Sequence, residues 1–125
     1  MKTIRTIAAL VCAVAALASP VWAGTYPVSG RWGLSGSVEK GPIDCSKLRV
    51  ISFNGSQRTD SKGGVPAYRN RTVANTGAGQ YSVVDEFTTG QIGNAHVDYT
   101  LRVVDAETLE LTMQPGGSLK LRKCK

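Results

Sequence analysis

The sequence is poor in the side chains that many enzymes use for proton transfer and metal binding. It has 125 residues and a single histidine, His96. A Ser–His–acid or Cys–His arrangement would have to use this residue, and no serine elbow motif accompanies it. Asp98 lies on the same strand face as His96, but a zinc site needs three or four ligands. We therefore expect no enzyme, no catalytic residue, no metal site and no cofactor, and we interpret His96 as a solvent-facing strand residue.

Aromatic residues are also scarce, at 6% of the chain. Nucleic-acid binding usually combines basic residues with stacking aromatics or with a helix that enters a groove. Only Tyr68 adjoins a basic cluster, formed by Arg69 and Arg71. A second cluster lies near the C-terminus and consists of Lys120, Arg122, Lys123 and Lys125. We interpret both clusters as solvated strand surface and expect no nucleic-acid partner, while an anionic partner stays open.

Long apolar runs are missing beyond the N-terminus, and the one run there has the form of a signal peptide. Lys2 and Arg5 precede an apolar stretch over 7–17, which is too short to span a membrane. Val21-Trp22-Ala23 then supplies the small or branched residues of a cleavage site. We predict that 1–23 is a cleavable signal peptide.

Cleavage after Ala23 leaves 24–125, which is long enough for one domain. A cut after Ala18 is the alternative. The whole chain carries a net charge of +6, and loss of Lys2 and Arg5 with the leader lowers it to +4. No second apolar stretch follows, so we expect a periplasmic or secreted monomer without an integral membrane segment.

Two of the three cysteines, Cys45 and Cys124, remain after cleavage. Disulfides persist outside the cytoplasm, and two cysteines in an exported domain most economically pair with each other. Such a bond would close a loop of about 80 residues and stabilise the fold by ~4 kcal/mol in the chain-entropy model. Two free thiols are the alternative.

Helical periodicity is absent from the mature segment, where short runs alternate between apolar and polar residues. Asn54-Gly55 between two such runs is a strong signal of a hairpin turn. The alternation and the turn residues predict eight strands, over 27–35, 47–53, 56–60, 67–74, 80–87, 97–104, 109–113 and 119–122.

Eight strands with no helix to cover them must bury their apolar side against one another. Short connections between successive strands make neighbours antiparallel. We predict an all-β fold, an antiparallel up-and-down barrel of about eight strands with one disulfide. Its first and last strands would be neighbours, and a bond from Cys45 to Cys124 fits that closure.

Gly30-Arg31-Trp32 at the head of the first strand, together with the meander and the basic last strand, resembles the calycin group. This group includes lipocalins, avidin-like barrels and small bacterial metalloprotease inhibitors. In lipocalins a Gly-x-Trp motif closes one barrel end, and a basic residue of the last strand packs over the tryptophan. The resemblance places Gly30, Trp32 and Arg122 in these positions. We take Trp32, Tyr99 and Arg122 as candidate ligand-binding residues.

Two functions follow as hypotheses. The first is an exported binding protein that acts on a small apolar ligand inside the barrel, or on an envelope or secreted protein at its rim. The second is a proteinaceous inhibitor of an extracellular or periplasmic protease, acting through an exposed loop or through the tail 24–28. The resembling inhibitors act through an N-terminal tail, but here only 24–28 precedes the first strand. A barrel of about 100 residues should be filled by its own side chains. A filled barrel would have to bind its partner at the outer surface.

The leader and the disulfide can be tested together by intact-mass measurement of the exported protein. The mass should correspond to 24–125 less the two hydrogens that oxidation of Cys45 and Cys124 removes. Two free thiols in the exported chain would contradict the predicted closure.

Overall fold

The computed structural model describes residues 21–22, 24–88, 93, 95–113 and 116–125, and it describes only the backbone of 21–22. The predicted leader therefore lies almost entirely outside the described residues. Within the described part the chain forms strands and turns and no helix, as predicted. A helix long and apolar enough to cross a membrane is therefore absent from this part of the chain.

Nine strands follow one another along the chain. They are β1 (Val21–Trp22), β2 (Gly30–Leu34), β3 (Val50–Asn54), β4 (Gln57–Asp60), β5 (Tyr68–Gly77), β6 (Gln80–Phe87), β7 (Ala95–Asp105), β8 (Thr108–Met113) and β9 (Gly117–Lys123). Strands β2 to β9 match the eight predicted strands, with ends that differ by a few residues.

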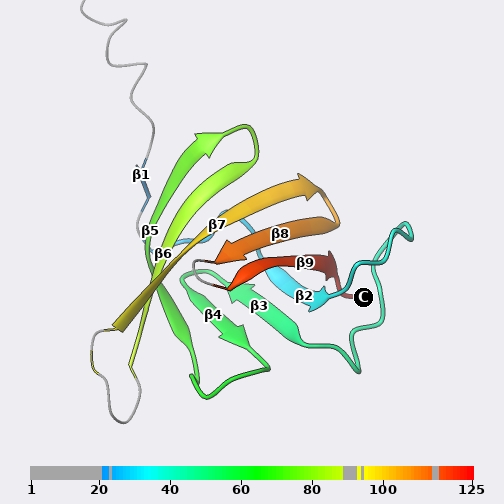
Figure 1. The fold of residues 1–125 in the computed structure, drawn as a ribbon, viewed down its shortest axis with the longest axis horizontal. Coiled ribbons are helices and arrows are strands. Elements are labelled where there is room, and N and C mark those ends of the chain that lie inside the picture. The colour runs from blue at the N-terminus through cyan, green and yellow to red at the C-terminus, as the bar shows by residue number, and fades with distance from the viewer. Residues whose placement is uncertain (1–20, 23, 89–92, 94, 114–115) are drawn as a thin grey trace, which may run out of the picture.

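Strands β2 to β9 form a closed antiparallel barrel in up-and-down order (Figure 1). Each strand pairs with its neighbours in sequence, and β2 pairs with β9 to complete the circle. In this closing pair Trp32 lies opposite Lys123, and Leu34 lies opposite Leu121. The predicted all-β barrel is confirmed, including the contact between its first and last strands.

The β3–β4 turn differs from the prediction by one residue. Asn54 and Gln57 are the last paired residues, so Gly55 and Ser56 form the turn. Gly55 has a φ of 63°, which suits the first central position of a primed hairpin turn. Asn54 thus belongs to the strand, and the first turn residue is a glycine, which adopts a positive φ without a steric cost.

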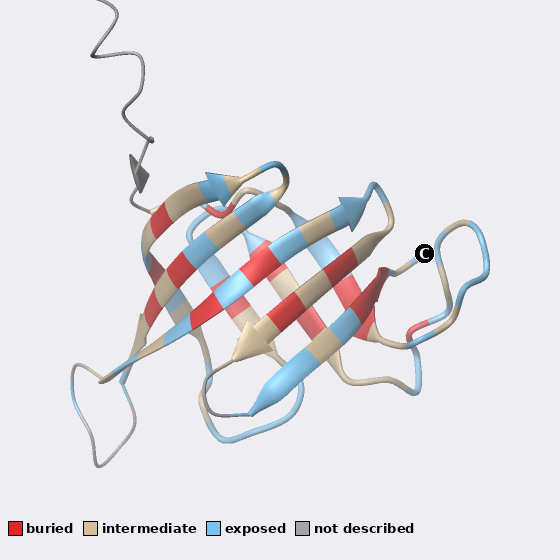
Figure 2. Cartoon of the chain, turned by 45° about the horizontal axis from the view of Figure 1, so that its top comes forward, coloured by how far each residue is buried: buried red, intermediate tan, exposed pale blue. Residues whose placement is uncertain are grey.

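Buried and exposed positions alternate along the strands of the barrel (Figure 2). Ile51, Leu101, Leu109, Leu111 and Leu121 expose none of their surface. A space for even one water molecule beside these side chains would expose part of them. The interior around these five residues is therefore packed, as expected for a small eight-stranded barrel.

The segment 24–28 packs against the barrel. Tyr26 is buried, its backbone N–H donates to the Gly55 carbonyl at 3.0 Å, and its ring meets that of Phe53 edge-on at 5.0 Å. Val28 packs against the same core. These contacts make the tail part of the fold.

Cys45 and Cys124 form the predicted disulfide, with Cα atoms 5.6 Å apart across 79 residues of sequence. The bond joins the long β2–β3 connection to the residue after β9. Gly33 makes room for it, since a Cβ on this residue would lie 2.6 Å from Cys45 Sγ. The covalent link thus holds the chain end against the strand with which it closes the barrel.

A C45S/C124S double variant should lose about 4 kcal/mol of unfolding free energy, because its unfolded state regains the freedom of a long loop. Urea denaturation of the oxidised wild type and the variant measures the difference. Added reductant should lower the wild type to the level of the variant and leave the variant unchanged. Equal midpoints for all three would contradict a stabilising bond.

Candidate functional site

The outer face of the barrel carries a groove of about 350 Å³ beside the connection between β2 and β3. One wall is the chain segment 35–38, and the other consists of outward-facing residues of β7, β8 and β9. We call this the valine groove. It is lined by Ser35, Gly36, Ser37, Val38, Arg102, Val104, Asp105, Thr108, Glu110, Lys120 and Arg122.

Two valines define the apolar part of the groove. Val38 is 94% exposed and Val104 is 45% exposed, and they are the exposed large hydrophobic residues of the described part of the chain. A single exposed apolar side chain is ordinary on a protein surface. Here both lie in one concave feature, although they are far apart in sequence.

Charged groups of both signs surround the two valines. Arg102 and Glu110 approach to 3.8 Å across β7 and β8, in an exposed pair of modest strength. Asp105 accepts a hydrogen bond from the Glu107 backbone N–H at 2.8 Å, and this bond holds the pKa of the carboxyl below its usual value. The groove thus combines apolar and charged side chains, as protein–protein contact surfaces do.

Arg122 fixes the loop that forms one wall, residues 35–44, which we call the clamped loop. The guanidinium Nη2 donates to the Gly41 carbonyl at 3.0 Å and to the Glu39 carbonyl, and Nη1 donates to Thr108 Oγ1 at 2.7 Å. Arg122 is only 7% exposed. Because a buried charge is costly without partners, the loop and the arginine stabilise each other.

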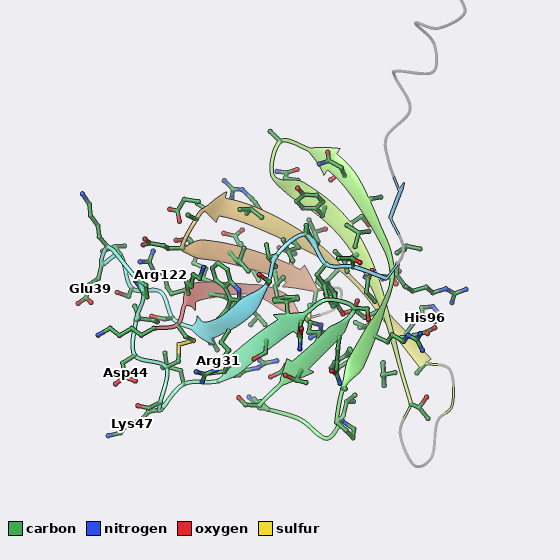
Figure 3. All side chains as sticks on the ribbon, turned by 180° about the vertical axis from the view of Figure 1, so that it is seen from behind. Arg31, Glu39, Asp44, Lys47, His96 and Arg122 are labelled. Atoms are coloured by element: carbon green, nitrogen blue, oxygen red, sulfur yellow. A yellow bond between two sulfur atoms is a disulfide. The ribbon has the colours of Figure 1, made fainter. Side chains whose placement is uncertain are left out.

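Further contacts hold both ends of the clamped loop. Glu107 accepts from the Gly41 N–H at 2.7 Å, and Ser35 N donates to the Lys120 carbonyl at 3.0 Å. Ile43 makes a bridge with Cys124, next to the disulfide. The loop that carries Val38 is therefore tied down on each side of this residue. Figure 3 shows Arg122 beside this loop, on the side of Glu39.

The candidate ligand-binding residues Trp32, Tyr99 and Arg122 lie in three different environments. Trp32 is buried in the core, with Nε1 donating to the Ser29 carbonyl at 3.0 Å. The basic group over its ring is Lys123 Nζ, 5.9 Å from the centroid. Lys123 lies opposite Trp32 and shares its face of the sheet. Because neighbouring side chains of a strand alternate, Arg122 points outward, where it binds the clamped loop. The expectation that Arg122 packs over Trp32 was wrong.

Tyr99 belongs to a buried polar cluster that the sequence analysis missed. Arg58 and Asp85 form an ion pair inside the barrel, with Nε and Oδ2 2.7 Å apart and 1% and 0% side-chain exposure. Tyr99 donates its hydroxyl to Asp85 at 2.8 Å, and Asn70 Nδ2 lies 3.3 Å from the other carboxylate oxygen. The ring of Tyr68 lies 3.9 Å from the Arg58 guanidinium. These partners let a charged pair remain inside a packed barrel.

Two tyrosine hydroxyls of this region remain protonated. Burial, reinforced by the Asp85 carboxylate, raises the pKa of Tyr99 well above its ordinary value, and the same two causes raise the pKa of Tyr26. Tyr99 therefore acts as a permanent donor to Asp85. The Tyr26 hydroxyl is buried with no hydrogen-bond partner among the described residues. The side chains of this cluster are thus buried, and Arg58, Asp85, Asn70 and Tyr99 are bonded to one another.

A wider depression of about 570 Å³ lies where β4, β5 and β6 meet. Tyr68 and Phe87, whose rings pack edge-on at 5.2 Å, form its aromatic part, and Arg69 and Glu86 add charge. It opens to solvent and does not reach the packed leucines. His96 lies far from the clamped loop (Figure 3). His96 and Asp98 are both exposed on β7, and the described residues contain no cluster of three or more potential metal ligands.

Replacement of Arg122 by Met should release the clamped loop and leave the barrel closed. We expect backbone amides of 35–44, Gly41 among them, to exchange hydrogen at least tenfold faster, and unfolding free energy to fall by about 1–3 kcal/mol. Hydrogen exchange with mass spectrometry measures the first effect. Lys120→Met on the same strand is the control, since its side chain makes no described bond to the loop. Unchanged exchange in R122M would show that the loop is held by other contacts.

Comparisons with models of protein families, with curated proteins and with solved structures each gave no match to this chain.

Proposed function

We propose that the chain is an exported binding protein of the calycin type that acts on a macromolecular partner, in the periplasm or outside the cell. The valine groove and the clamped loop are the proposed contact surface. The observation that carries this proposal is the convergence of Val38 and Val104 on a groove whose wall is tied down by Arg122 and the disulfide.

The packed interior argues against the other form of the hypothesis, a small apolar ligand inside the barrel. Four leucines of β7, β8 and β9 expose no surface, and the polar cluster around Arg58 and Asp85 is buried beside β4 and β5. A guest would have to displace well-packed side chains or an ion pair, and both are costly. Binding at the surface requires neither.

The clamped loop suits recognition because it is already ordered. A flexible loop loses conformational freedom when it binds, and this loss weakens binding. A loop that is already ordered in the free protein avoids that cost. Arg122, Glu107 and the Cys45–Cys124 bond remove that freedom in the free protein. Burial of the exposed Val38 side chain in a partner would then contribute about 1.5–3 kcal/mol.

An enzyme inhibitor is a particular form of the same proposal, and one observation favours a version that acts through the loop. An exposed, rigid loop tip is suited to a concave partner such as an enzyme cleft. The tail 24–28 is less suited, because Tyr26 is buried and packs on Phe53. Threading this tail into a protease would remove a core residue from the barrel.

A charge in place of Val38 in the clamped loop should weaken partner binding and leave the fold intact. For Val38→Asp we expect affinity to fall about ten- to a hundredfold, because the apolar contact is lost and a charge would be buried. The measurement is native mass spectrometry of protein purified from its own cell envelope, followed by titration with the retained partner.

Thr76→Asp is the matched control, because Thr76 is also exposed but lies on β5, outside the groove. It should retain the partner at the level of the wild type. A retained small molecule that stays bound to the V38D variant would contradict the proposed surface.

A further inference from the structure

One edge of β5 is only partly covered by the barrel. β4 pairs with β5 at two positions, Gln57 with Arg69 and Arg58 with Tyr68. A further backbone bond from Asn70 N to the Ser56 carbonyl ends this contact. Beyond it, the edge of β5 is covered by β1, the end of the predicted leader, as Figure 1 shows.

The covered stretch is short and regular. β1 runs antiparallel to β5, with Val21 opposite Ala74 and Trp22 opposite Val73. On the far side of β5, the pairing with β6 is irregular between Asn70 and Thr72 and again between Asn75 and Gly77. The stretch 72–75 between these irregularities has no proline and no charge, the two features that commonly protect a free edge.

The chain leaves β1 at a well-defined position. Gly24 N lies 3.1 Å from Asn70 Oδ1, and the Asn70 side chain is fixed by bonds from Nδ2 to the Thr72 carbonyl and to Asp85. Cleavage after Ala23 would turn Gly24 N into a charged α-ammonium and would take β1 away. Arg71, exposed on β5, adds a second positive charge at this end of the edge.

We propose that the mature protein has a second binding site, at the edge 72–75 of β5, for an extended peptide that ends in a free carboxylate. The peptide takes the place of β1 and pairs antiparallel with β5. Since β1 runs toward Gly24, the peptide's C-terminus comes to lie near the Gly24 ammonium and Arg71. Strand addition supplies the affinity, and the two positive charges select a free C-terminus.

This site rests on leader removal after Ala23 and is separate from the valine groove, so either proposal can fail without the other. The proposed ligand is an extended peptide because β1 occupies this edge in the structure. A cut after Ala23 turns one backbone amide into the two groups that the site would pair, an ammonium on the protein and a carboxylate on the released strand. Opposite charges at that position replace the covalent bond with electrostatic attraction.

The test uses exported, disulfide-bonded protein whose N-terminus is shown by mass spectrometry to be Gly24. The probes are two synthetic peptides with the sequence of residues 19–23, acetylated at the N-terminus, one with a free C-terminal carboxylate and one with a C-terminal amide. Titrations followed by NMR should shift the backbone amides of 72–75. The acid should bind at least threefold more tightly than the amide.

Arg71→Gln should reduce this preference for the acid, and Arg69→Gln should leave it unchanged, because Arg69 lies where β4 already covers β5. A chain that begins at Ser19 keeps β1 and should bind neither peptide. Equal binding of acid and amide, shifts outside the β5 edge, no binding at millimolar peptide, or a mature N-terminus other than Gly24 would each overturn the proposal.

Discussion

The closure of the barrel between β2 and β9, fixed by the Cys45–Cys124 bond, is the constraint on which the other features depend. It brings the end of the chain beside the connection between β2 and β3. Without this closure, Arg122 would have no loop carbonyls to bind, and 35–38 would have no facing wall of strands. Because one covalent bond links the barrel seam to the proposed contact surface, the proposal ties recognition to the stability of the fold.

Some charged side chains of this small protein are buried and hold parts of the fold together. Arg58 and Asp85 are fully buried, and tyrosine and asparagine side chains complete their hydrogen bonding. Arg122 lies outside the barrel but is almost equally covered, by the loop that it fixes. In both places a costly buried charge is tolerated because it has specific partners, and such partners define one arrangement of neighbouring chain segments.

Strand alternation predicted the fold and most of the core, because neighbouring residues of a strand point to opposite faces. The alternation predicts that Leu101, Leu109 and Leu111 point into the barrel, and all three are fully buried. The same alternation puts Asp85 on the face of the buried Val83, which was the signal for the missed ion pair. The valine groove could not be predicted, because Val38 is a lone apolar residue in an irregular loop and gives no periodic pattern. Only the closed barrel brings it near Val104.

The disulfide next to the clamped loop also makes the proposed activity depend on compartment. In a reducing cytoplasm Cys45 and Cys124 would be thiols, and the tether at the end of the loop would be missing. The bonds from Arg122 and Glu107 would then have to hold the loop without the covalent tether. If the chain is exported as proposed, oxidation after translocation would complete the contact surface only in the compartment where the proposed partner is met.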